Sequence, residues 1–270
     1  MNFLPECDYY LDPTVSMDSL RVALNEQLTV TAYVVKYSAA SQSLIVKFGN
    51  GIGGKIPLEE STIYSLHKDA RISANVSYLV GQTIRAKVLS IDGNTVILSR
   101  KANMLDVLSK IKHEKSFVNA VISSMFGHLI FIDVADGIRG IVRPENLTPV
   151  RFSSGKFDLG LRVKMRLPVS VLFFNEEIQS FELSHREFIP DIEDELSVGD
   201  VLICKVLDKV DSPRDICYGY FAVVGNAMYS GIIDSPISLP YGTNVLALIS
   251  RISEKGLHLK FITRCMSKPL

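Results

Sequence analysis

A short unit with the signature of a β-hairpin occurs three times in this chain of 270 residues. In its first copy, from Val80 to Lys101, apolar residues alternate with polar ones up to an Asp-Gly-Asn turn at 92–94, and apolar residues resume as far as Leu98. Side chains alternate between the two faces of a strand. The pattern therefore predicts a hairpin, with one face formed by Ile84, Ala86 and Val88 and a basic face formed by Arg85 and Lys87.

The repetition of this unit predicts a tandem array of similar small domains. Later copies run from Leu159 to Arg186 and from Pro240 to Phe261. Upstream of the first copy, strand-like segments flank a glycine-rich turn at 49–54, which gives five strands in 28–103. Three strands, a longer connection and two more strands suit a closed barrel, because closure removes exposed strand edges.

The repeats and the segments between them predict five regions. We expect an irregular leader with a short helix over residues 14–27, and a second helix over 102–114 because apolar residues recur there at helical spacing. The third repeat is the most divergent, since the connection between Ile233 and Gly242 is too short for a helix. The predicted regions are the leader (1–27), a first barrel (28–103), a linker helix (104–114), a second barrel (115–190) and a third barrel (191–270).

Charge and composition argue against several classes of protein. The chain has 29 basic and 29 acidic residues, which is unlike a protein that binds polyanions without specificity. The charge is nevertheless uneven, with a net −4 over residues 1–27 and a net +5 over residues 28–103. No apolar run approaches the roughly 20 residues of a membrane helix, so we expect no membrane partner.

The N-terminal segment and the cysteines predict a cytoplasmic protein. The first residues include acids and lack the basic start and long apolar core of a secretory signal. The four cysteines show no CxxC spacing and the five histidines no metal-binding pattern, so we expect reduced thiols, no metal and no cofactor. Walker, GxSxG and Rossmann motifs are also missing from the sequence, which predicts that the protein is not an enzyme.

Two recurring motifs resemble those of the S-one RNA-binding domain, a family of OB-folds. Each repeat has a Gly-[Lys/Ile]-[Ile/Val] motif at Gly54, Gly140 or Gly231, and the first two end in Leu-Ser-[Arg/His]-[Lys/Arg] at 98–101 and 183–186. The resemblance covers residues 28–101 and 115–186, and more distantly 197–264. It implies an all-β fold with short helices, made of three tandem five-stranded OB-fold barrels, and binding of single-stranded RNA.

The resemblance also implies which side chains face RNA. In that family, two aromatics in a Phe-Gly-Ala-Phe-Val phrase and a His in Gly-Leu-Val-His lie on the RNA face, with an Asp and a basic residue from the last hairpin nearby. Phe126 matches the first aromatic, whereas Leu129 stands at the second and Arg143 at the His. The predicted RNA-binding residues are Phe126, His128, Arg143, Arg162 and Lys164 in the second repeat, and Tyr37, Lys55, Arg85 and Lys87 in the first.

The three repeats differ in what these residues predict. In the second, Phe126 stacks a base or, alternatively, belongs to the core. Arg162, Lys164 and Arg166 are expected to form a basic stripe on the outward face of the fourth strand. In the first, the cations favour phosphate contact without base stacking. In the third, aromatics at 218–221 match the family, Asp234 replaces the His, and a fourth strand that is apolar on both faces favours contact with another domain.

Two functions remain open from the sequence. The first is a non-catalytic protein that binds single-stranded RNA in translation or post-transcriptional control, with affinity in the micromolar range or weaker because net charge and aromatics are limited. The second is a protein-interaction adaptor, attached to the ribosome or another assembly, whose barrels have largely lost RNA binding. Aromatic and basic residues that converge on strands two and three favour RNA, whereas apolar patches favour a protein partner.

Overall fold

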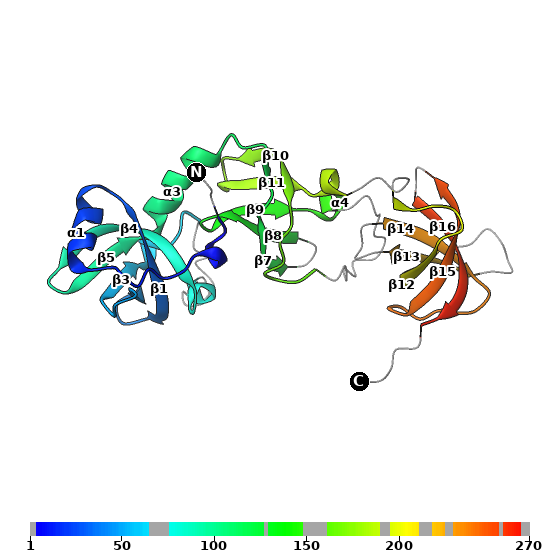
Figure 1. The fold of residues 1–270 in the computed structure, drawn as a ribbon, viewed down its shortest axis with the longest axis horizontal. Coiled ribbons are helices and arrows are strands. Elements are labelled where there is room, and N and C mark those ends of the chain that lie inside the picture. The colour runs from blue at the N-terminus through cyan, green and yellow to red at the C-terminus, as the bar shows by residue number, and fades with distance from the viewer. Residues whose placement is uncertain are drawn as a thin grey trace. The chain divides into compact units, whose positions relative to one another are not determined.

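The computed structural model describes residues 4–64, 76–126, 129–147, 161–189, 195–210, 218–224, 229–253 and 256–265. These residues form an all-β protein with short helices (Figure 1). Along the chain, a closed five-stranded barrel is followed by a six-stranded sheet and then by a second closed five-stranded barrel. The predicted all-β class with OB-type barrels is therefore confirmed. The chain divides into two compact units, 1–124 with 131–141 and 166–182, and 125–130 with 142–165 and 183–270.

The first barrel has the strand order β1-β2-β3-β5-β4. All neighbouring strands are antiparallel except β3 and β5, which run parallel. The predicted core face of the hairpin is confirmed, since Ile84, Ala86 and Val88 are fully buried. The strands are β1 (Thr29–Ser38), β2 (Ser43–Lys47), β3 (Gly53–Pro57), β4 (Thr83–Asp92) and β5 (Thr95–Ser99).

The repeated glycines Gly54 and Gly231 stand where two parallel strands meet. A Cβ atom on Gly54 would lie 2.9 Å from the Val96 carbonyl oxygen, and one on Gly231 would lie 2.7 Å from the Leu257 carbonyl oxygen. Both distances are too short for a carbon–oxygen contact, so only glycine lets the third strand approach the fifth. The motif that recurs in the sequence thus marks the line along which each of these two barrels closes.

The closing Leu-Ser-Arg-Lys motif joins the last strand of the first barrel to a helix. Leu98 is buried in the barrel, and the Ser99 hydroxyl accepts a hydrogen bond of 2.8 Å from the Ala102 backbone N–H. Ser99 is thus the N-cap of α3 (Arg100–Ile111), as is usual for serine at a helix start. The helix predicted at 102–114 is present and begins two residues earlier.

The predicted leader helix is α1 (Met17–Asn25), which begins at a capping box between Ser16 and Ser19. It packs against the first barrel with Leu20 and Ala23 in the core. Short 3-10 turns occur at η1 (Glu6–Asp8), η2 (Leu58–Glu60), η3 (Ser77–Leu79) and η4 (Arg186–Phe188), and a short helix α4 at Pro144–Leu147.

The middle sheet repeats the barrel order with its first strand split in two. Its order is β6-β10-β11-β9-β8-β7, and β6 pairs with β10. In the first barrel, one strand makes both pairings: 29–33 of β1 pair with β4 and 33–38 pair with β2. A turn at 118–119 interrupts the equivalent strand here, which gives six strands rather than five. The strands are β6 (Ser116–Phe117), β7 (Val121–Phe126), β8 (Leu129–Ala135), β9 (Ile138–Val142), β10 (Val169–Asn175) and β11 (Ser180–Ser184).

The prediction that the basic residues at 162–166 lie on the fourth strand is wrong. Arg162 and Lys164 lie in a turn closed by a hydrogen bond of 3.0 Å from Met165 N–H to the Arg162 carbonyl, and β10 begins only at Val169. Lys164 has a φ of 74°, in the left-handed region, which a continuing strand does not adopt. Of the three cations, only Arg166 makes a bridge, to Val121.

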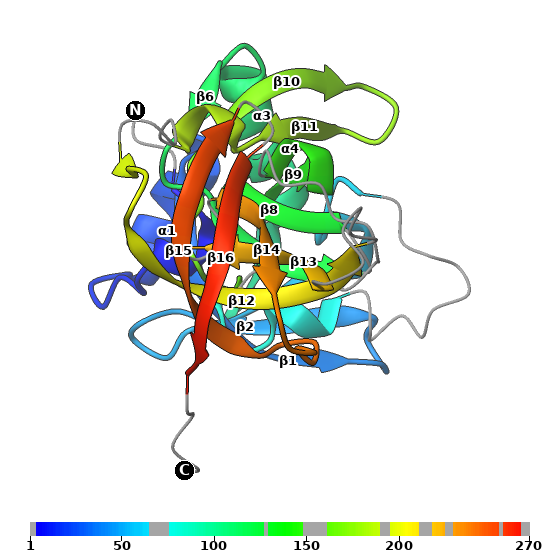
Figure 2. The ribbon, with the colours of Figure 1, turned by 90° about the vertical axis from the view of Figure 1, so that its right-hand side faces the viewer.

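The third repeat closes in the same order as the first, β12-β13-β14-β16-β15, although its sequence is the most divergent. Figure 2 shows β15 and β16 as a long hairpin across the face toward the viewer. Val245, Ala247 and Ile249 of β15 are buried in the core, and the opposite face of this strand is half-buried. The strands are β12 (Val201–Val210), β13 (Tyr218–Val224), β14 (Tyr229–Ser235), β15 (Asn244–Ser253) and β16 (Gly256–Arg264).

Within the part of the chain that the structure describes, no helix combines the length and the apolar character that membrane crossing requires.

Candidate nucleic-acid interface

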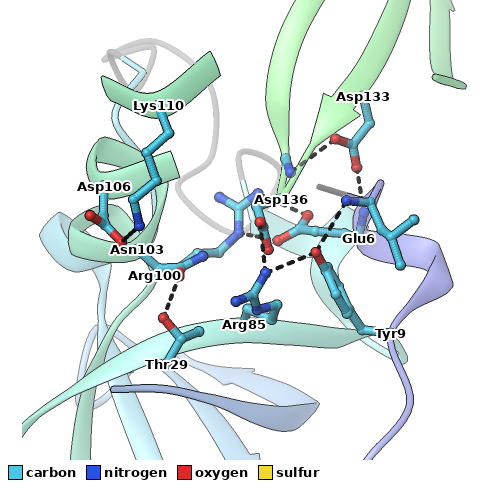
Figure 3. A network of polar contacts seen from close by, with 12 residues as sticks. Glu6, Tyr9, Thr29, Arg85, Arg100, Asn103, Asp106, Lys110, Asp133 and Asp136 are labelled. Carbon is cyan, nitrogen blue, oxygen red and sulfur yellow. Dashed lines mark hydrogen bonds and ion pairs between the residues drawn. The ribbon is translucent and has the colours of Figure 1, made fainter. Parts of the chain in front are cut away.

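The basic face of the first hairpin already has carboxylate partners. Arg85 Nη1 lies 3.1 Å from Asp136 Oδ2 and donates a hydrogen bond of 3.0 Å to the Tyr9 hydroxyl (Figure 3). Lys87 Nζ lies 3.6 Å from Asp106 Oδ2. The structure thus places both predicted phosphate contacts in ion pairs within the protein, and phosphate binding by either side chain stays a prediction.

Arg85 lies at the partly exposed edge of an ionic cluster, which we define as Glu6, Arg85, Arg100, Asp133 and Asp136 (Figure 3). The side chains of Arg100 and Glu6 are only 1% and 6% exposed. Arg100 donates two hydrogen bonds to Glu6, from Nε to Oε1 at 2.5 Å and from Nη2 to Oε2 at 2.8 Å. Such a two-pronged contact is the strongest geometry that a guanidinium and a carboxylate form.

Asp133 and Gly137 complete the ionic cluster from the β8–β9 hairpin. Asp133 accepts hydrogen bonds from the backbone N–H of Glu6 at 2.8 Å and from that of Gly137 at 3.0 Å. Gly137 has a φ of 77°, and a Cβ atom there would lie 1.8 Å from Arg100 Nη2. Only glycine therefore lets this turn close over the guanidinium, and the leader segment, α3 and the hairpin meet at one point.

Burial changes the acidity of the carboxyl groups in the ionic cluster. Burial first, and then the nearby Glu6 carboxylate, raise the pKa of Asp133 to about 8. Burial also raises the pKa of Asp136 to about 6, although the Arg85 guanidinium opposes this shift. Three carboxyl groups face two guanidiniums, so the ionic cluster is electrically balanced when one carboxyl group holds a proton.

The local sequence around Glu6, Asp133 and Asp136 has no pattern that marks them as members of a site. One signal was present in the unequal charge of the chain, because the acidic leader and the basic first repeat carry opposite net charges. That complementarity is what the Glu6–Arg100 contact uses.

The other predicted residues of the first barrel give a sparse surface. Tyr37 is half-buried and packs against the core. Lys55 faces outward in a cross-strand row, because it pairs with Ile45 on β2 and with Ile97 on β5. This row holds Lys55 between two aliphatic side chains and continues to the exposed Lys36, which pairs with Ile45, but it has no aromatic ring on which a base could stack.

In the second repeat, Phe126 is 80% exposed at the end of β7, so the alternative that it belongs to the core is wrong. Arg143 follows β9 and is exposed, and Arg162 and Lys164 are exposed in the turn before β10. The structure thus puts these cations at the surface on separate elements. His128 lies outside the described residues.

The third barrel carries a row of side chains across four strands. Phe221 on β13 pairs with Ile232 on β14, Ile232 pairs with His258 on β16, and His258 pairs with Arg251 on β15. Residues that lie directly opposite one another project from the same face of a sheet. The residues beside them in the chain point into the core, namely Ala222, Ile233, Leu257 and Leu259, so this outward row faces solvent.

The outward row lines a groove of about 550 Å³, to which Ser230 and Ser253 also contribute. With strands about 4.8 Å apart, Phe221 and Arg251 are separated by roughly 14 Å. The β15–β16 hairpin is held by hydrogen bonds from Ser250 Oγ to the His258 carbonyl and from Ser253 Oγ to the Gly256 carbonyl, both 2.9 Å. The aromatic ring of Phe221, the imidazole of His258 and the guanidinium of Arg251 therefore project from hydrogen-bonded strands of one sheet.

The other aromatics matched in the third repeat have different positions. Tyr220 is buried, and its hydroxyl accepts a hydrogen bond of 3.0 Å from the Leu239 backbone N–H. The side chain of Tyr218 lies outside the described part of the chain. Asp234 is exposed on β14 and is paired in register with Lys260, so a cation stands beside the residue that replaces the family's His.

Comparisons with known proteins give structural similarities only. No family model matches this chain, and no curated protein matches it. A multidomain protein with nucleic acid binding domains from Streptococcus pneumoniae is 12% identical, over 90% of this chain and 75% of that one, with a TM-score of 0.28. Drosophila Unr (CSD456) is 11% identical, over 88% of this chain and 98% of that one, with a TM-score of 0.21.

Proposed function

We propose that this chain is a non-catalytic protein that binds single-stranded RNA through its OB-type barrels, as the resemblance to the S-one family implies. The observation that carries the proposal is the outward row in the groove of the third barrel. Its ring offers a stacking surface for a base, and its imidazole and guanidinium offer donors to the phosphate backbone. The outer face of strands two and three is also where OB-folds hold oligonucleotides.

The first barrel has a row of outward side chains at the positions that correspond to the outward row of the third barrel. Gly54 and Gly231 open the same parallel pairing, so Lys55 corresponds to Ile232 and Ile97 corresponds to His258. The first barrel therefore has an aliphatic residue at the position of the imidazole, and it also lacks the ring that Phe221 provides. The sequence favoured domain contact for the third barrel. That prediction is untested, and we propose instead that the main RNA contact lies on this barrel.

We place the protein in translation or post-transcriptional control in the cytoplasm, where thiols stay reduced. Cys7, Cys204 and Cys265 are free thiols, which fits that setting. With a net charge of zero and one aromatic ring in the outward row, we expect dissociation constants in the micromolar range.

The test is a titration of fluorescent single-stranded RNA with Arg251→Ala and a matched control, Arg264→Ala, which removes an exposed arginine from the same barrel. If Arg251 contacts one phosphate, its loss should lower the affinity by about tenfold and reduce the slope of log affinity against log salt by about 0.7. The control should leave both unchanged. Equal affinities for Arg251→Ala and the parent protein would contradict the proposal.

One observation favours the adaptor as a second candidate function. On β12, Val201 and Ile203 are exposed and pair with the half-buried Leu248 and Leu246 of β15. Nearby strand β16 exposes Ile262 as well. Adjoining apolar side chains on a surface are typical of protein contacts. An Ile203→Asp variant that retains RNA binding but loses a partner in co-purification would assign this face to a protein.

A further inference from the structure

A tyrosine from the first repeat lies on the outer face of the middle sheet. The Arg139 guanidinium of β9 is 4.3 Å from the centre of the Tyr64 ring and 5.5 Å from the centre of the Phe131 ring of β8. The Tyr64 hydroxyl also accepts a hydrogen bond from the Arg139 backbone N–H. The guanidinium thus contacts two aromatic rings, one from its own sheet and one from the connection that follows η2.

Phe131 and Arg139 occupy the positions at which an OB barrel holds its ligand. Their neighbours Ile132 and Ile138 are buried in the core, so Phe131 and Arg139 project outward. β8 and β9 are the second and third strands of this repeat, if the split first strand is counted once. An outward ring beside an outward guanidinium on these strands is the combination that stacks a base and contacts phosphate.

The chain that leads to Tyr64 is firmly anchored. Ser61 is fully buried, and its carbonyl oxygen accepts a hydrogen bond of 2.8 Å from Arg100 Nη1 in the ionic cluster. The Ser61 hydroxyl donates to the Leu58 carbonyl at 2.6 Å, and the Tyr64 N–H donates to the Thr62 hydroxyl at 3.2 Å. The backbone three residues before Tyr64 is therefore held by buried contacts.

We propose that Tyr64 is an intramolecular stand-in for a nucleic-acid base, which occupies the exposed Arg139 guanidinium and competes there with a ligand of the second repeat. This inference rests on the proposed function, because it assigns to the second repeat the same ligand class that the third barrel binds. Tyr64 presents the flat face that a base would present to the guanidinium. Its hydroxyl accepts a hydrogen bond from the Arg139 backbone N–H, as a polar group of a ligand could.

The test compares the affinity of fluorescent single-stranded RNA for variants of the full chain. Tyr64→Leu keeps an apolar side chain but removes the ring and the hydroxyl, and it should raise the affinity by roughly tenfold as one stacking position is opened. Tyr64→Ala should do the same, so the two variants check each other if one folds poorly. Tyr64→Phe keeps the ring over the guanidinium and should bind like the parent protein.

Three controls separate this inference from the proposed function. Tyr10→Ala removes a tyrosine that is 88% exposed in the leader and should give no gain. In an Arg251→Ala background the gain should persist, whereas a second change, Phe131→Leu, should abolish it. If Arg251→Ala weakens binding but neither Tyr64 variant strengthens it, the proposed function stands and the base stand-in is refuted. A gain that survives Phe131→Leu, or that Tyr10→Ala reproduces, would also refute it.

Discussion

Glu6→Gln should be among the most destabilising single changes in the leader, since it leaves a buried guanidinium without its main counter-ion. The Glu6 carboxylate receives two N–H groups of Arg100, and both side chains are almost completely inaccessible to water. A neutral amide has one oxygen to accept a hydrogen bond, and its NH₂ group would face a donor. Removing one partner of a buried ion pair typically costs roughly 3–5 kcal/mol of unfolding free energy.

The remaining contacts of Arg100 reduce this cost only in part. Its Nη1 keeps the Ser61 carbonyl and lies 3.0 Å from the Met104 sulfur, neither of which carries a charge. The Asp133 carboxyl is close enough to respond, because the loss of the Glu6 charge would lower its raised pKa and let it ionise. We therefore expect a loss near the lower end of the range, about 3 kcal/mol at neutral pH.

Urea denaturation followed by circular dichroism measures this loss as a shift in the midpoint at constant slope. Asp18→Asn is the control, since it removes the exposed ion pair with Arg21 and should cost at most about 0.5 kcal/mol. The double variant Glu6→Gln with Arg100→Met should recover stability, because it removes the unpaired charge as well. A loss below about 1 kcal/mol for Glu6→Gln, or no recovery in the double variant, would refute this reasoning.

Two further changes test the ionic cluster and the second repeat. The folded pKa of Asp133, about 8, lies above its unfolded value near 3.9, so its contribution to stability is complete below about pH 4 and is lost as the pH rises through about 8. Asp133→Asn should therefore reduce the fall of unfolding free energy with pH in this range, by up to about 1.4 kcal/mol per pH unit. Urea denaturation at a series of pH values measures this fall. The same pH dependence in the variant and the parent protein would contradict a raised pKa of Asp133. Phe126→Ala should lower the free energy of unfolding by less than about 0.5 kcal/mol because the ring is exposed. It should weaken RNA binding by roughly 1–3 kcal/mol if the ring stacks a base. A loss of stability above about 3 kcal/mol would show that the ring supports the core.

The sequence predicted those parts of the fold that depend on local alternation. Ile84, Ala86 and Val88 lie on the core face as their spacing required. Gly54 and Gly231 recur because no side chain fits between the parallel strands. Alternation says which face of a strand a residue joins, but not what lies opposite that face. For this reason the sequence placed Arg85 at a surface for phosphate, whereas Asp136 and Tyr9 occupy that surface.

The outward row of the third barrel was missed for a related reason. Phe221 was matched by its sequence neighbours, but His258 and Arg251 become its companions only through the parallel pairing of β14 with β16 and a register shift between Ile249 and Arg251. Neither feature has a signature in the hairpin sequence. The error at Lys164 has another source, because a left-handed backbone conformation at a lysine interrupts a pattern that otherwise reads as a strand.

The ionic cluster has a consequence for the order in which this protein folds as it is made. Glu6 reaches Arg100 across 94 positions of the chain and Asp133 across 127. A growing chain that has completed the strands of the first barrel still has Arg85 without its aspartate, because the β8–β9 hairpin has not yet been synthesised. Contacts between such distant residues slow folding, since a long loop must close before they form. We therefore expect the leader to complete its contacts only after the second repeat has emerged, because the Glu6 backbone N–H donates to Asp133.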